Sequence, residues 1–384
     1  MAAQWVDTQL KAPQGGFVLE RLPKRPNELL RAWDAADEYL LGYLAEHALP
    51  ALGMKVVIVN DSFGALAVAL HACLPVAISD SYLSQQAIRD NLKINGLADS
   101  SVQLQDSLAV SSGHIDVLLI KAPKTLALLE YQLQYLRPRL NESSHILVAG
   151  MIKALPASVW RLLEQYLGPT STSLAQKKAR LITVKWQGGI KVPDNRYPVH
   201  YQLENSPYQI SNHANVFSRD SLDIGTRFFL QHLPALSEPS DIIDLGCGNG
   251  VVGLMVASRN PKANICFIDE SFMAVASAED NFRRAFGNAR DAHFLVADGL
   301  TVTPEHSADM IFCNPPFHQQ QAIGGQIATA MFNGATRVLR KKGQLWVIGN
   351  RHLNYHLPLK KLFGNVAIVA SNDKFVIYRS TQYK

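Results

Sequence analysis

The sequence predicts an α/β protein with two tandem domains, each built on a parallel sheet covered by helices on both faces. In the second half, short apolar stretches alternate with helical segments, which is the pattern of parallel sheets whose strands are connected by helices. The first half repeats the same order of segments. A chain of 384 residues is long enough for two domains, which we place at residues 1–188 and 189–384.

The elements of the second half follow in order along the chain. The apolar stretch that begins at residue 241 is predicted to form a strand, and it runs into a glycine-rich turn that ends at residue 250. A helix follows and ends before Pro261. Further strands are predicted at 264–270, 292–298, 308–314 and 343–350, with helices at 271–286 and 326–343. Ligands of such sheets bind beyond the carboxyl ends of the strands.

Segments of the first half between residues 55 and 124 align with segments of the second half in the same order. Lys55 aligns with Asp241, 186 positions later, and Lys121 aligns with Asn314, 193 positions later. A long period of this kind indicates a duplicated domain rather than a solenoid. Two unrelated α/β domains with similar sheets are the alternative.

The two halves differ where a ligand is expected. Of the glycines in the turn, the first half keeps only Gly64. It also has Lys121 and Lys124 where the second half has Asn314 and Phe317. These lysines, together with the basic clusters at 137–139, 176–180, 350–352 and 359–364, are candidates for holding a phosphate backbone.

Composition excludes several classes of protein. The formal net charge is +5 and there is no basic tail, so contact with nucleic acid has to come from local patches. The four cysteines form no C-x-x-C pair, which argues against a zinc site or a disulfide framework. The first residues lack the apolar core of a signal peptide, and no stretch is long enough to span a membrane. We therefore expect a soluble, cytoplasmic protein without a metal.

The glycine-rich turn can be interpreted in two ways. Gly248, Gly250 and Gly253 match the G-x-G-x-x-G pattern of dinucleotide-binding proteins, in which Asp269 would bind a ribose. Asp244, followed by glycines at every second position, matches the D-x-G-x-G-x-G pattern of S-adenosylmethionine-dependent methyltransferases. Either ligand needs glycines that let the backbone turn and approach it closely. The turn alone leaves both cofactors open.

The fourth predicted strand decides between them, because it ends in Asn314, Pro315, Pro316 and Phe317. Methyl transfer to an sp² amino nitrogen needs hydrogen-bond acceptors, since the nitrogen's lone pair is delocalised. The amide oxygen of Asn314 and the rigidly held carbonyl of Pro315 can accept from that amine. Phe317 offers a face on which a planar base can stack. No metal and no nucleophilic cysteine are needed.

This combination resembles the class I methyltransferases that act on amino groups. Together with "HANVFSRDSLDIGTRFFLQHLP" at 213–234, "NPPFHQ", and "NRHL" at 350–353, it resembles the family of ribosomal RNA guanine-N2 methyltransferases, and within it the large-subunit branch. The resemblance covers essentially the whole chain. It implies two tandem class I, Rossmann-like methyltransferase domains, of which the N-terminal one is degenerate and non-catalytic and is expected to bind RNA.

The resemblance also implies the cofactor, the substrate and the residues of the site. The donor would be S-adenosylmethionine and the acceptor guanine N2 in 23S ribosomal RNA. The implied cofactor-binding residues are Asp244, Gly246, Cys247, Gly248 and Gly250 at the methionine part, Asp269 and Glu270 at the ribose, Asp298 near the adenine, and Phe217 and Thr226 in the upstream segment. The target base would be held by Asn314, Pro315, Pro316 and Phe317. No membrane and no obligate protein partner are implied.

Two other functions remain open at this point. Related enzymes use the same short motif to methylate a glutamine amide of a protein or adenine N6, so the motif does not identify the acceptor. A ribosome-assembly factor in which catalysis is secondary is the alternative from a different class.

Overall fold

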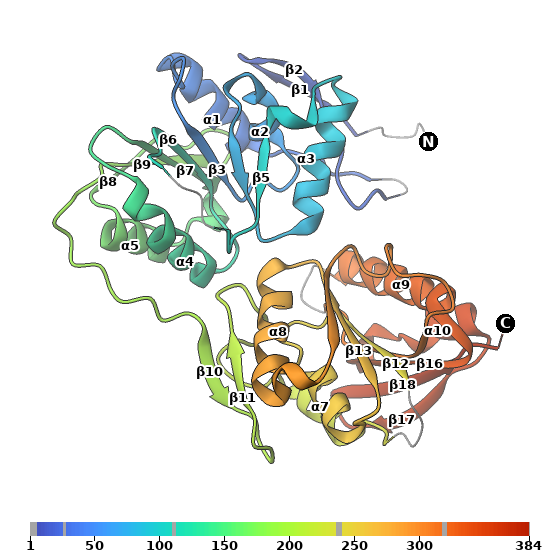
Figure 1. The fold of residues 1–384 in the computed structure, drawn as a ribbon. Helices are drawn as coiled ribbons and strands as arrows, with labels where there is room; N and C mark the ends of the chain where they lie inside the picture. The colour runs from blue at the N-terminus through green and yellow to red at the C-terminus, as the bar shows by residue number, and fades with distance from the viewer. Residues whose placement is uncertain (1–5, 26–27, 110–112, 236–239, 317–320, 384) are drawn as a thin grey trace. The chain divides into compact units, whose positions relative to one another are not determined.

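The computed structural model describes residues 6–25, 28–109, 113–235, 240–316 and 321–383 (Figure 1). The chain divides into two compact units, residues 1–196 and residues 197–384. The predicted domain boundary, between residues 188 and 189, lies after the last strand of the first unit. Within the described residues, no helix is long and apolar enough to cross a membrane.

The first unit is a seven-stranded mixed sheet with helices on both faces. Its strand order is β5-β4-β3-β6-β7-β9-β8, in which β3 to β7 are parallel and β9 and β8 are antiparallel. The sheet strands are β3 (Val56–Val59), β4 (Val76–Ile78), β5 (Gln103–Gln105), β6 (Val117–Lys121), β7 (His145–Met151), β8 (Thr170–Thr172) and β9 (Ala179–Val184). A separate hairpin consists of β1 (Gln9–Ala12) and β2 (Gly15–Val18).

The helices of the first unit belong to two separate cores. One core contains α1 (Ala35–Glu46), α2 (Ala65–Ala69) and α3 (Tyr82–Ile94), and the other contains α4 (Leu126–Leu136) and α5 (Ala157–Tyr166). Strand β3 is buried along its whole length and supplies side chains to both cores. A strand buried on both faces is expected to be apolar throughout, as the sequence VVIV is.

The second unit has the same architecture. Its strand order is β14-β13-β12-β15-β16-β18-β17, again with five parallel strands followed by two antiparallel ones. Its strands are β12 (Asp241–Leu245), β13 (Asn264–Asp269), β14 (Ala292–Val296), β15 (Ala308–Cys313), β16 (Leu339–Asn350), β17 (Ala367–Ser371) and β18 (Phe375–Thr381). The hairpin of this unit consists of β10 (Val199–Gln202) and β11 (Gln209–Asn212).

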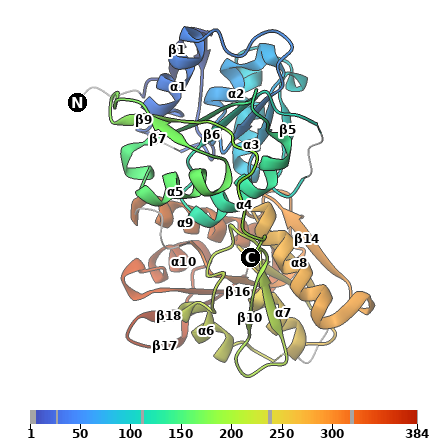
Figure 2. The same ribbon diagram turned by 90° about the vertical axis from the view of Figure 1, so that its left-hand side faces the viewer.

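The helices of the second unit also lie on opposite faces of its sheet. Figure 2 shows α7 and α8 on one side and α9 and α10 on the other. The helices are α6 (Ile224–Gln231), α7 (Val251–Arg259), α8 (Phe272–Phe286), α9 (Gln321–Val338) and α10 (His356–Phe363). The structure therefore confirms the predicted fold of two Rossmann-like α/β units, and each unit has its own core.

The agreement between the units extends to single hydrogen bonds. In the first unit, the side chain of Asn91 accepts from the amide of Glu20 and donates to the carbonyls of Glu20 and Phe63. In the second unit, Asn281 makes the same three bonds with Ser211 and Asn249. Asn91 thus joins the segment just after the first unit's hairpin, and Asn281 joins β11 of the second unit's hairpin, to the loop after the first sheet strand. The interpretation as a duplication stays a prediction, which these repeated bonds support.

One predicted boundary is wrong. The helix predicted at 326–343 ends at Val338, and β16 begins at Leu339 rather than at residue 343. Lys342 adopts a left-handed conformation, with φ of 69°, and its amide donates to the carbonyl of Gln382. The basic residues 340–342 therefore belong to an irregular strand entry rather than to a last helical turn.

Candidate active site

The glycine-rich loop follows β12 and is fixed to the end of the neighbouring strand β13. Gly246, Gly248 and Gly250 have φ values of 69°, 54° and 75°, a region that favours glycine. The amides of Gly246 and Cys247 both donate to the carbonyl of Ile268, at 2.8 and 3.0 Å. The loop therefore has a defined shape, set by left-handed backbone and by hydrogen bonds to β13.

The glycines of the loop have different tasks. A Cβ at Gly250 would lie 2.7 Å from the Cβ of Ala278 on α8, whereas a Cβ at Gly248 would meet no atom within 4 Å. Gly250 is thus needed for packing, and Gly248 leaves the space above the loop open. Gly64 in the first unit is also left-handed and packs closely against Ile88 of α3. This explains why the first unit keeps only this glycine, because close packing against α3 requires it whether or not a ligand binds.

Alanine substitutions at these two glycines are expected to separate packing from ligand access. Gly250→Ala combines left-handed strain with overpacking, and should lower the free energy of unfolding by about 2–4 kcal/mol. Gly248→Ala carries only the strain, about 1–2 kcal/mol, but its methyl group enters the open space, so cofactor affinity should fall. Urea unfolding and titration calorimetry with S-adenosylmethionine measure the two effects. Equal loss of stability in both variants would contradict this assignment.

Three predicted acids lie at the carboxyl edge of the same sheet. Asp244, near the end of β12, is buried and accepts from the amide of Gly253 at 2.7 Å. Burial raises its pKa to about 7. Asp269, at the end of β13, accepts from the amide of Gly248 at 2.9 Å, and burial raises its pKa as well. Burial also raises the pKa of Asp298, which follows β14.

These carboxylates fit the polar parts of a nucleoside cofactor. A desolvated carboxylate gains most from donors such as ribose hydroxyls, because it lacks water to solvate its charge. Asp269 lies next to the open space above Gly248, so a ribose there would be within reach of it. Glu270 follows Asp269 and is half-buried. Within the described residues, no group of three or more histidine, cysteine or acidic side chains is placed to hold a metal ion.

Two further predicted residues, Cys247 and Phe217, do not belong to this group of acids: one side chain lies in the core and the other is exposed. The side chain of Cys247 belongs to the core of the unit, and burial raises the pKa of its thiol well above the usual range. A buried neutral thiol is a poor nucleophile. Cys247 therefore contributes to the loop through its backbone and not through its side chain. Phe217 lies in the segment between β11 and α6, and 53% of it is exposed.

Asn314 leaves the sheet next to the glycine-rich loop. Strands β12 and β15 are paired, with Leu245 opposite Cys313, so the loop and Asn314 emerge from the sheet side by side. The carbonyl oxygen of Asn314 lies 3.9 Å from the position that a Cβ on Gly246 would take. Pro315 is buried and Pro316 is exposed. Phe317 lies outside the described residues.

The amide of Asn314 has one satisfied and one unsatisfied end. Its Nδ2 donates to the hydroxyl of Thr226 at 3.0 Å. Its Oδ1 is buried and has no hydrogen-bond partner among the residues that the structure describes. Thr226 in turn donates, through its hydroxyl and through its amide, to the carboxylate of Asp223, at 3.1 and 2.8 Å. Asp223 is the N-cap of α6. The site therefore presents a free acceptor beside the cofactor loop.

Sequence reasoning missed the residues that brace the loop. Asn249, inside the loop, donates to Asn212 at 2.8 Å and to the hydroxyl of Tyr201 at 3.3 Å, both on the β10–β11 hairpin. Asn281 holds the same loop through the carbonyl of Asn249. The internal alignment contained a signal for Asn281, because Asn91 stands at the matching place in the first half.

At the corresponding place in the first unit, charged side chains line a small pocket of about 130 Å³. Lys121, at the end of β6, donates to Asp34 at 2.9 Å and to Asp37 at 2.6 Å. Asp61 accepts four backbone amides at the start of α2, at residues 64–67. The expectation that Lys121 contributes to an RNA surface is therefore wrong, because its side chain is only 14% exposed and its ammonium group is paired with Asp34 and Asp37.

Other basic clusters are also partly used inside the protein. Arg137 donates to the carbonyls of Tyr166, Gln187 and Gly188, and Arg351 donates to the carbonyl of Asn372. These guanidinium groups stabilise loops. Five lysines of the clusters are exposed: Lys124, Lys177, Lys178, Lys360 and Lys361.

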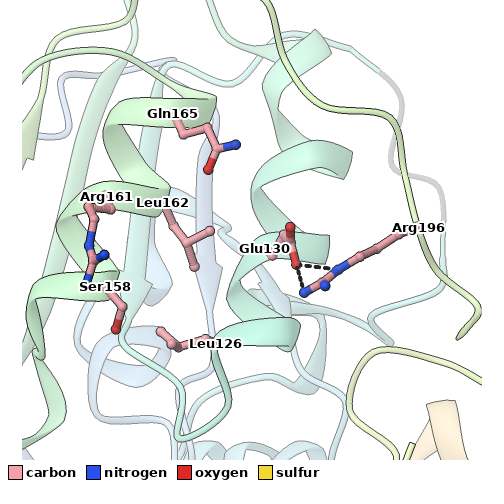
Figure 3. A pocket seen from close by; sticks show the side chains of 7 residues that line it. All are labelled: Leu126, Glu130, Ser158, Arg161, Leu162, Gln165 and Arg196. Carbon is pink, nitrogen blue, oxygen red and sulfur yellow. Dashed lines mark hydrogen bonds and ion pairs between the residues drawn. The ribbon is translucent and has the colours of Figure 1, made fainter. Parts of the chain in front are cut away.

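A cavity of about 340 Å³ lies beside α4 and α5 in the first unit (Figure 3). Arg196 donates twice to Glu130 there, at 3.0 and 2.6 Å, and the hydroxyl of Tyr166 donates to the other oxygen of Glu130. The described residues that line this cavity include none of the predicted site residues. It is thus separate from the candidate active site.

The strand order of the second unit, its glycine-rich loop and the Asn-Pro-Pro end of β15 define a class I methyltransferase. Residues 7–188 match the family described as the RLMG N-terminal domain, and residues 207–379 match the methyltransferase small domain. The chain belongs to the ribosomal RNA large subunit methyltransferase G family, which confirms the resemblance noted in the sequence.

Relatives of that name match over nearly their whole length. A protein named ribosomal RNA large subunit methyltransferase G from Streptomyces coelicolor is 48% identical, over 97% of this chain and 100% of the relative. One from Aeromonas salmonicida is also 48% identical, over 98% of this chain and 99% of the relative. Among solved structures, the T. thermophilus 16S rRNA N2 methyltransferase RsmC, in complex with AdoMet and guanosine, has a TM-score of 0.75 at 19% identity and covers 98% of this chain and 97% of its own. This last likeness shows the shared fold.

Proposed function

We propose that the second unit transfers a methyl group from S-adenosylmethionine to the exocyclic N2 of a guanine in 23S ribosomal RNA. The observation that carries the proposal is the amide oxygen of Asn314, which is buried without a partner among the described residues. The backbone of the same residue lies beside the cofactor loop. A buried acceptor without a donor costs free energy. An amino group of the target base would supply the missing donor.

The reaction needs little from the protein beyond positioning. S-adenosylmethionine, when bound, supplies an electrophilic methyl group on a sulfonium. The N2 nitrogen of guanine is a weak nucleophile because its lone pair is delocalised into the ring. Asn314 Oδ1 and the carbonyl of Pro315 would accept its two N–H groups, which favours the pyramidal transition state. The amino nitrogen forms the new bond to carbon as the carbon–sulfur bond breaks, and its extra proton then passes to water.

The predicted site residues share this work in the proposal. Asp244 and the loop glycines would bind the methionine part, Asp269 with Glu270 the ribose, and Asp298 the adenine. Phe317 would stack on the guanine. Phe217 would close the site from the upstream segment.

The first unit, in the proposal, takes no part in catalysis and contributes RNA contacts. At its corresponding place, Lys121 stands where the second unit has Asn314 and is ion-paired to Asp34 and Asp37, which supports the non-catalytic role. Exposed lysines such as Lys124 and Lys178 support contact with phosphates. Four free cysteines and a ribosomal RNA acceptor support the cytoplasm as the compartment.

The experiment uses the full chain, radiolabelled S-adenosylmethionine, and ribosomal RNA from cells that lack this protein. The two large RNAs are separated before digestion to nucleosides. We expect label in N2-methylguanosine from 23S RNA and none in RNA from cells that contain the protein. Label in N6-methyladenosine, or label in the protein fraction alone, would refute guanine N2 as the acceptor and favour adenine or a glutamine amide instead.

A further inference from the structure

We infer that Thr226, held by Asp223, sets the orientation of the Asn314 amide and so decides which of its two ends faces the target base. This inference rests on the proposed function of Asn314 as an acceptor. It moves Thr226 from the predicted cofactor-binding residues to a positioning residue for the acceptor base. Asp223, which sequence reasoning did not select, becomes part of the same device.

The direction of the hydrogen bonds follows from the chemistry of the three side chains. A carboxylate only accepts hydrogen bonds, and a threonine hydroxyl has a single proton. The hydroxyl of Thr226 gives that proton to Asp223 at 3.1 Å, so its lone pairs remain to accept. The group 3.0 Å away must therefore be the donor end of Asn314, its Nδ2. The acceptor end, Oδ1, is left to face the place of the substrate.

The surroundings keep this orientation in place. Thr226 is 6% exposed, so water is not a ready competitor for its hydroxyl. The amide of Thr226 also donates to the same oxygen of Asp223, at 2.8 Å, which fixes the carboxylate at the start of α6. If the amide turned over, Nδ2 would face the amino group of the base, and two donors would oppose each other. The orientation therefore distinguishes a site that accepts from an amine from one that repels it.

The first unit contains the same three-position arrangement with other residues. Asp34 is the N-cap of α1 and Asp37 is its third residue, as Asp223 and Thr226 are in α6. Lys121, at the position that aligns with Asn314, donates to both. Lys121 at the end of β6 thus donates to the first turn of α1, and Asn314 after β15 donates to the first turn of the corresponding helix, α6. In this interpretation the first unit uses the arrangement to hold a lysine, and the second unit uses it to orient an amide.

The test compares Thr226→Val with Thr226→Ser. Valine keeps the shape of threonine and removes the hydroxyl, whereas serine keeps the hydroxyl. Thr303→Val is the matched control, because Thr303 is 8% exposed and its hydroxyl is buried without a partner. We expect Thr226→Val to lower the single-turnover rate of methyl transfer about tenfold to a hundredfold. Thr226→Ser and Thr303→Val should stay within about threefold of the unchanged protein, and all three should bind S-adenosylmethionine as before.

A second readout needs neither cofactor nor RNA. The side-chain NH₂ signals of Asn314 are identified in ¹⁵N spectra of the full chain by their loss in Asn314→Ala. We expect their exchange with water to be slow in the unchanged protein and in Thr226→Ser, and faster in Thr226→Val. If Thr226 had only a structural role, Thr226→Val would lower the stability of the protein, and serine would not restore the slow exchange of the Asn314 signals.

The outcomes separate the inference from the proposed function. If Thr226→Val transfers methyl groups like Thr303→Val while Asn314→Ala is inactive, the inference is overturned and the proposed function stands. Unchanged exchange of the Asn314 signals in Thr226→Val would also overturn it. If the unchanged protein methylates no RNA, the proposed function falls, and the exchange measurement still decides whether Thr226 orients the amide.

Discussion

Replacing Asn314 with alanine is expected to lower the rate of methyl transfer by a factor of about 10² to 10³, with little change in folding or cofactor affinity. The side chain is the only part of Asn314 removed, so the backbone turn into Pro315 remains. The loss reflects the missing acceptor for the amino group in the transition state. Single-turnover transfer from labelled S-adenosylmethionine to ribosomal RNA measures the rate, and calorimetry measures cofactor binding.

The matched control is Asn333→Ala, at an exposed position of α9. It should leave both the rate and the cofactor affinity unchanged. If Asn314→Ala kept half of the rate, the unpartnered Oδ1 would have no part in catalysis and the proposed mechanism would be wrong. If instead cofactor affinity fell along with the rate, Asn314 would belong to the cofactor site.

The second large effect is expected on stability, at Lys121. Lys121→Ala should lower the free energy of unfolding by about 3–5 kcal/mol at neutral pH, because it leaves the buried carboxylate of Asp37 without its cation. Burial already raises the pKa of Asp37 to about 6. Removing Lys121 raises the pKa of Asp37 further, because the lysine favours the charged form. The variant therefore takes up its proton at a higher pH than the unchanged protein, and the stability deficit should shrink as the pH falls towards 6. Urea unfolding at pH 5 and pH 7.5 measures this.

Lys124→Ala is the control for Lys121, because Lys124 is exposed and lies three positions later. We expect it to leave stability unchanged and to weaken RNA binding with a smaller dependence on salt. Lys121→Ala, at a temperature where it is folded, should bind RNA normally. The opposite result, with weaker RNA binding in Lys121→Ala, would restore Lys121 to the RNA surface.

Most of the fold could be predicted from the sequence because parallel strands buried on both faces are continuous apolar runs. The runs at 241–245 and 308–313 are examples, and both are sheet strands. The β10–β11 pair was not predicted, since its strands are short and lack a clear apolar pattern. The β17–β18 pair was also missed, although both strands contain apolar runs, AIVAS and FVIY. The end of α9 was misplaced because basic residues suit a last helical turn as well as a strand entry.

The candidate site also contains residues that could be predicted from the sequence and residues that could not. Glycines before a helix and an Asn-Pro-Pro sequence have few other uses, so the loop and Asn314 could be selected from local sequence. Asp223 and Lys121 could not be assigned, since a charged residue looks the same in sequence whether it faces water or a partner. The partners of Lys121 lie 84 and 87 positions earlier in the chain, and only folding brings them to it.

The hairpin in front of the catalytic unit also determines where that unit can be cut from the rest of the chain. The match to the methyltransferase small domain begins at residue 207, between β10 and β11. A fragment that starts there would lose the Tyr201 support of the cofactor loop and the buried Leu203. It would also expose β11 as an unpaired edge, which favours aggregation. An expression fragment of the catalytic half should therefore begin at Tyr197, so that both strands of the hairpin are included.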